Sequence, residues 1–159
     1  MSERDRAEIV FPMVKDARGW PPVRAEHVWA ERCGEDLFRV ENAPFFVRDL
    51  AVGDLVRAVP SALETGPVFV ERVAWSGNCT IRVMPLRNGE LADDDVGLVV
   101  DAFKALGIQS ETAGVYPIVS LCVPMDADLA AVKALIEQGQ RDGRWEWEEG
   151  CVGQVWLDL

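Results

Sequence analysis

The chain has 159 residues, 49% of them hydrophobic, and a formal net charge of −11 at pH 7. This length suits one domain or two very small ones sharing a core, and the hydrophobic share is that of a folded protein. Nucleic acids and anionic membranes attract Lys and Arg, so the charge argues against binding to either. No apolar run approaches the roughly 18 residues needed to span a bilayer, and no signal-like segment begins the chain. We therefore expect a cytoplasmic protein.

The first part of the chain reads as β structure. Residues 1–22 are expected to be a lead-in with an edge strand at 8–14, because a proline at position 12 cannot donate a ladder hydrogen bond. Residues 23–78 alternate β-prone runs with turn residues, which predicts a small barrel-like unit. The strands expected in it are 28–33, 37–41, 44–48, 54–59 and 68–75.

The run of Phe45 and Phe46 precedes a Gly53-Asp54 turn, where a small barrel would turn a corner. In a strand, consecutive rings point to opposite faces, so one ring is expected in the core and the other against the second half or a partner.

The second part predicts a ferredoxin-like unit at residues 79–151. A strand at 80–86 leads to a helix opened by three aspartates at 93–95, with apolar residues at helical spacing behind them. Two strands, a second helix capped by Asp126 or Asp128, and a final strand at 144–148 follow. This βαββαβ order gives an α+β fold in which the two units pack together. Residues 152–159 are expected to be a C-terminal tail.

Several ordered motifs resemble a bacterial family known as domain of unknown function 4265. They include Trp-Pro-Pro-Val at 20–23, Val-Glu-Asn-Ala-Pro-Phe-Phe at 40–46, Ser-Gly-Asn-Cys-Thr-Ile-Arg-Val at 76–83 and Gly-Arg-Trp-Glu-Trp-Glu-Glu-Gly-Cys at 143–151. The resemblance extends from about Trp20 to Cys151. It implies no catalytic residues, because the family brings none.

The sequence shows no clear catalytic constellation. His27 is the only histidine, and strand alternation places its neighbour Glu26 on the opposite face, which leaves the imidazole without an orienting partner there. Cys79 and Cys122 lie in expected core strands, and Cys151 is the thiol expected to be most exposed. We expect reduced thiols, no metal and no cofactor, because the cysteines lack metal-site spacing and no phosphate-binding glycine motif is present. An enzyme is therefore less favoured than a binding protein.

Two hypotheses remain. The first is a non-enzymatic module for a basic protein partner, with an immunity-type or adaptor role, since aromatic rings rimmed by charge are typical of interface hot spots. Its candidate residues are Trp145, Glu146, Trp147, Glu148 and Glu149. The alternative is a small-molecule sensor that binds an anionic metabolite between the two units. Its candidate residues are Arg48, Arg57 and Arg82. The sequence does not settle the oligomeric state.

Overall fold

The computed structural model describes residues 5–159. The chain forms two compact units, the first ending at Ser76 and the second beginning at Gly77. The first unit contains strands β1–β5, and the second contains strands β6–β10 and the helices. The protein is therefore α+β, as expected from the sequence. Among the described residues, no helix has the length and apolar character needed to cross a bilayer.

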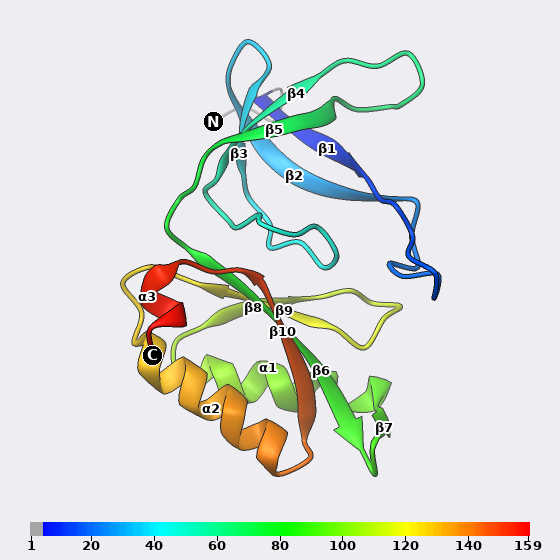
Figure 1. The fold of residues 1–159 in the computed structure, drawn as a ribbon. Coiled ribbons are helices and arrows are strands. Elements are labelled where there is room, and N and C mark those ends of the chain that lie inside the picture. Colours follow the sequence, from blue (N-terminus) through cyan, green and yellow to red (C-terminus); the bar gives the residue numbers. More distant parts are fainter. Residues whose placement is uncertain (1–4) are drawn as a thin grey trace. The chain divides into compact units, whose positions relative to one another are not determined.

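Five strands of the first unit form a closed barrel (Figure 1). Successive strands pair antiparallel, and β1 closes the barrel against β5 through the parallel pair Val10 and Val68. The backbone N–H of Val10 also donates to the carbonyl of Pro67 at 2.8 Å. The strands are β1 (Arg6–Pro12), β2 (Ala25–Gly34), β3 (Leu37–Val40), β4 (Leu55–Val59) and β5 (Val68–Ala74).

The strand expected at 8–14 is present as β1, but it is part of the barrel wall, so its expected place at the edge of a lead-in is wrong. All seven of its residues pair with β2. Ile9, Val10 and Phe11 are almost completely buried. Pro12 is tolerated because it is the last residue of the strand, where the ladder ends.

The segment expected as a strand at 44–48 is instead part of a long loop between β3 and β4. Its backbone bonds to a side chain from another strand. The Glu26 carboxylate on β2 accepts the N–H groups of Phe45 (2.6 Å), Phe46 (2.9 Å) and Val47 (2.9 Å). The apolar pattern of this segment predicted a strand. The prediction failed because the acceptor of its N–H groups, Glu26, lies on a different part of the chain.

A second buried carboxylate holds the far end of the same loop. Asp54 is fully buried, and its oxygens accept the N–H groups of Ala51 (2.9 Å) and Ser76 (2.8 Å). Gly53 has a φ of 89°, in the left-handed region that glycine enters without strain. The loop therefore turns where the sequence predicted a corner, and it is anchored at both ends by buried acids.

The second unit is a five-stranded antiparallel sheet with helices (Figure 1). Its strands lie in the order β10-β6-β9-β8, and β7 pairs with the end of β6. Asn88 and Gly89, with φ of 56° and 81°, form the two-residue turn between β6 and β7. The elements are β6 (Cys79–Arg87), β7 (Glu90–Leu91), the 3-10 turn η2 (Asp93–Asp95), α1 (Val96–Lys104), β8 (Gln109–Thr112), β9 (Val119–Val123), α2 (Leu129–Arg141), β10 (Trp145–Cys151) and α3 (Gln154–Leu157).

Alternation along the strands separates the two faces of this sheet. On β6, Ile81 and Val83 belong to the hydrophobic core that also contains Phe103 of α1 and Ile136 of α2, whereas Arg82 has the opposite orientation. The helices therefore cover one face of the sheet, and the other face carries polar side chains at its centre.

The C-terminal residues are not a tail, contrary to the sequence expectation. Residues 154–157 form α3, and the indole of Trp156 is completely buried in the core of the second unit. The amino group of Lys133 on α2 donates to the carbonyl of Trp156 at 3.1 Å. The buried Trp156 side chain thus holds the C-terminal end of the chain in place. The sequence did not predict this, because the segment is short and has no clear helical pattern.

The two helices begin differently. Asp128 caps α2 as predicted, because its carboxylate accepts the N–H of Ala131 at 3.0 Å. The three aspartates before α1 form the η2 turn and make no side-chain capping bond. Asp95 forms an ion pair with Arg87 of β6, while Asp93 and Asp94 are exposed.

Candidate functional site

Both tryptophans of β10 lie on the helix-covered side of the sheet. Trp145 is only 3% exposed, and its indole N–H donates to the carbonyl of Ile136 at 2.9 Å. Trp147 is half-buried, and its indole N–H donates to the side-chain oxygen of Gln140 at 3.0 Å. These rings pack against helix α2, so little of Trp145 can reach a partner.

The carboxylates of β10 already contact other groups of the second unit. Glu148 accepts from the guanidinium of Arg82 at 2.8 Å, and Glu149 accepts from the indole of Trp156 at 2.7 Å. Glu146 is exposed and has a longer contact of 3.4 Å with Gln140. Of the three glutamates, Glu146 is therefore the one best able to meet a basic group from outside.

The three candidate arginines do not form one site. Arg57 on β4 lies 3.3 Å from Glu71 of β5, and Arg48 is exposed on the loop between β3 and β4. Arg82 belongs to the second unit, is 1% exposed and is bound to Glu148. Two of the three guanidinium groups are thus matched by carboxylates within their own unit.

Arg82 is the centre of a polar row on the helix-free face of the sheet. The strand register places four polar residues side by side on β10, β6, β9 and β8. They are Glu148, Arg82, Ser120 and Glu111, in that order. A Cβ placed on Gly150 would meet the Arg82 guanidinium at 2.9 Å, so glycine leaves room for that group. This row is a feature that sequence reasoning missed, although the alternation of β6 pointed to Arg82.

His27 and the cysteines do not come together in a reactive site. His27 is on the outside of β2, and its Nδ1 lies 3.3 Å from the carboxylate of Glu8. Cys151, expected to be the most exposed thiol, is buried, and Cys33 is the exposed one. Burial raises the pKa of the thiols of Cys79 and Cys122, which makes them weaker nucleophiles near neutral pH.

An acidic and apolar surface surrounds η2 and the start of α1. Glu90, Asp93 and Asp94 are exposed. Leu91 and Leu98 are 60% and 66% exposed, which is high for leucine. A small cavity of ≈ 100 Å³ lies nearby, with Leu98, Trp145 and the ion-paired Asp95 among its lining residues. We refer to these five exposed residues and this cavity as the η2 surface.

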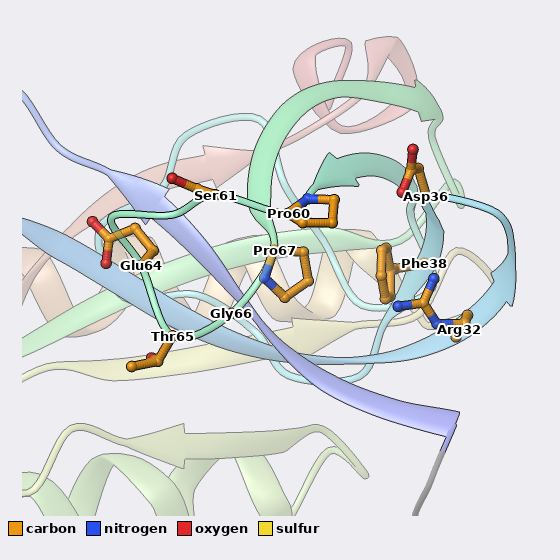
Figure 2. Close-up of a pocket in the computed structure, with 9 residues that line it drawn as sticks. All are labelled: Arg32, Asp36, Phe38, Pro60, Ser61, Glu64, Thr65, Gly66 and Pro67. Carbon is orange, nitrogen blue, oxygen red and sulfur yellow. The ribbon is translucent and has the colours of Figure 1, made fainter.

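The barrel of the first unit has a pocket of ≈ 190 Å³ between the β2–β3 turn and the loop that joins β4 to β5. Figure 2 shows Arg32 and Phe38 on one side, and Ser61, Glu64 and Thr65 from the β4–β5 loop on the other. Phe38 is completely buried, and the Arg32 guanidinium lies 4.6 Å from the centre of its ring. We call this the barrel pocket.

In residues 5–159, no group of three or more His, Cys, Asp or Glu side chains has an arrangement that could hold a metal ion. None of the four cysteines forms a disulfide bond. The candidate sites are therefore the two surfaces just described and the polar row around Arg82.

Comparison with known proteins agrees with the motifs found in the sequence. The family described as Domain of unknown function (DUF4265) matches residues 26–147. The chain belongs to this family. The DUF4265 match extends from β2 in the barrel to β10 in the sheet, so it includes most of both units.

A solved structure has a similar fold. It is described as "Novel crystal structure of a hypothetical protein from Neisseria gonorrhoeae", with a TM-score of 0.72 and 17% sequence identity. The alignment covers 93% of this DUF4265 chain and 96% of the neisserial one. At this identity the likeness shows a shared fold only. No curated protein matches the chain.

Proposed function

We propose that the protein is a non-enzymatic binding module for a basic protein partner, and that the second unit carries the interface. The observation that carries this proposal is the uneven distribution of charge. Residues 77–159 contain 14 acidic and six basic residues, a net charge of −8, whereas residues 1–76 contain 13 and 10, a net charge of −3. A concentrated negative field attracts and orients a positively charged partner.

The η2 surface is the part of the second unit best suited to that partner. Its carboxylates on Glu90, Asp93 and Asp94 make no hydrogen bond or ion pair with the described part of the chain. Leu91 and Leu98 add apolar area that a partner can bury. Interfaces of this kind combine an apolar centre with a charged rim, and the rim contributes mainly to association rate and specificity.

The β10 residues contribute less in this proposal than the sequence suggested. Glu148 and Glu149 already satisfy Arg82 and Trp156, so a partner would have to compete with internal bonds for them. Glu146 remains available at the edge strand of the sheet. We therefore place Glu146 at the margin of the interface and the η2 surface at its centre.

We also infer that the second unit is a ferredoxin-like module. The support is the strand order β10-β6-β9-β8 with every neighbouring pair antiparallel and a helix after the first and third strands. This arrangement places both helices on one face of the sheet. An immunity-type or adaptor role fits a rigid module of this kind, whose charged surface is presented by short loops and helix starts.

The anionic-metabolite alternative has weaker support. It requires guanidinium groups that can turn to a ligand, but Arg57 and Arg82 are matched by Glu71 and Glu148. Arg48 is the remaining candidate, and a single exposed arginine gives little selectivity.

The test is a charge reversal with a matched control. The variant Asp93→Lys/Asp94→Lys changes the η2 surface, and Glu35→Lys/Asp126→Lys changes the net charge equally at exposed positions elsewhere. A partner is captured from a lysate of the native organism with the wild-type protein, identified, purified and titrated by calorimetry. We expect a basic protein whose affinity falls about tenfold, or about 1.4 kcal/mol, in the first variant and little in the second. Equal effects of the two variants, or capture of no protein at all, would contradict the proposal.

A further inference from the structure

The barrel pocket contains charged groups of both signs that do not neutralise each other. Arg32, Asp36 and Glu64 all line it. The Arg32 guanidinium lies over the Phe38 ring, and no ion pair joins it to either acid in the part of the chain that the structure describes. All three charged groups can therefore turn to a ligand that enters the pocket.

The backbone fixes the two rims that carry these groups. Asp36 has a φ of 57° in the turn between β2 and β3, and its carbonyl accepts the N–H of Ala58. On the other side, a Cβ on Gly66 would collide with the carbonyl oxygen of Glu8, so the loop carrying Glu64 lies directly against β1. Both rims of the pocket are therefore positioned by the barrel itself.

Each rim offers a different chemistry. A guanidinium stacked on an aromatic ring keeps its N–H edges available and is suited to a bidentate bond with a carboxylate. The opposite rim offers the carboxylate of Glu64 with the hydroxyl of Thr65, and the hydroxyl of Ser61 already accepts the N–H of Leu63 at 3.2 Å. Carboxylates and hydroxyls of this kind accept hydrogen bonds from an ammonium group.

We propose that the barrel pocket binds a small zwitterion of the α-amino-acid type. Arg32 holds its carboxylate, Glu64 on the opposite rim attracts its ammonium group, and the buried ring of Phe38 lies beneath the Arg32 guanidinium. The volume of ≈ 190 Å³ suits a molecule of this size and is below the roughly 300 Å³ at which drug-sized sites begin. A simple anion would face two acids, and a simple cation would face Arg32, so a ligand with both charges fits best.

The experiment measures the melting temperature of the full chain with a panel of α-amino acids. Matched controls are carboxylates without an amine, such as propionate, and amines without a carboxylate, such as ethylamine. A ligand that binds only the folded state raises the melting temperature by several degrees when present at about 100 times its dissociation constant. We expect this shift with at least one amino acid and not with the singly charged compounds.

Variants then assign the site. Arg32→Gln and Glu64→Gln are each expected to weaken binding of that amino acid at least tenfold by calorimetry. Arg24→Gln and Asp126→Asn, at exposed positions outside the pocket, are expected to leave the affinity unchanged. The melting temperature without ligand shows whether each variant is folded, and amide chemical shifts of residues 32–38 and 60–67 report binding without any mutation.

Three results would overturn the proposal: no amino acid that binds, a singly charged compound that binds equally well, or unchanged affinity in both pocket variants. None of them bears on the η2 surface, which lies in the other unit and takes a different class of ligand.

Discussion

Removing the Glu26 carboxylate tests whether a single side chain holds the loop between β3 and β4. Glu26→Ala leaves the backbone N–H groups of Phe45, Phe46 and Val47 without their acceptor. Bonds to a charged acceptor contribute about 1.5–3 kcal/mol each, and a buried donor left unpaired costs about 1–3 kcal/mol. Phe45 and Phe46 are half-buried and can recover water, whereas Val47 is buried. We expect the first unit to lose about 3 kcal/mol of unfolding free energy.

The variant Glu26→Gln separates charge from shape. It keeps one carbonyl oxygen, but its amide N–H₂ would point at a backbone donor, so we expect an intermediate loss of about 1–2 kcal/mol. The assay is urea unfolding followed by amide signals of the barrel, because the two units need not unfold together. Glu35→Ala, an exposed position in the β2–β3 turn, is the control and should change stability by less than about 0.5 kcal/mol.

Hydrogen exchange gives a second, local readout of the same reasoning. In Glu26→Ala the amides of residues 45–47 should exchange faster than in the wild-type protein, since their protection depends on the missing carboxylate. The amides of β1 should change less. A loss below about 1 kcal/mol together with unchanged exchange at these three amides would show that the carboxylate does not hold the loop.

Two further predictions concern glycine and pH. Gly139→Ala in α2 should destabilise the second unit by about 1–3 kcal/mol, because the new methyl group collides with the Trp145 ring. In calorimetric melting, Gly97→Ala in α1, where the space is open, should be neutral or gain up to about 1 kcal/mol, and equal effects of the two would contradict this. Burial raises the pKa of Cys79 and Cys122 above the ordinary 9.0, so the folded state keeps thiol protons that the unfolded state releases. Stability should therefore fall as pH rises above about 9, and Cys79→Ala/Cys122→Ala should reduce that slope in urea titrations at several pH values.

The sequence predicted the elements whose pattern is local. The elements of the second unit could be predicted because helical spacing, an N-cap at Asp128 and turns such as Asn88-Gly89 each depend on neighbouring residues. Class α+β and the family follow from the same local motifs. Features decided by distant residues were missed. The run at 44–48 looks like a strand until the Glu26 carboxylate is known, and Trp156 looks like part of a tail until its buried contacts are seen.

The candidate sites show the same limit. Composition identified the acidity of the chain, but only the structure shows that Glu148 and Glu149 are bound internally while Asp93 and Asp94 are exposed. The barrel pocket could not be predicted, because it joins residues 32–38 to residues 60–67 and depends on how two turns meet at one end of the barrel.

The anchoring of the loop between β3 and β4 affects how the exposed residues of that loop can change during evolution. Glu26 binds backbone N–H groups, which every amino acid except proline provides, so this one anchor does not depend on which side chains residues 45–47 carry. Substitutions at the exposed Arg48 can therefore alter surface chemistry while the backbone stays in place, whereas Asp49 has a φ of 56°, which most residues adopt only with strain. Relatives could acquire new specificities at this loop at little cost in folding, provided that the glutamate on β2 is retained.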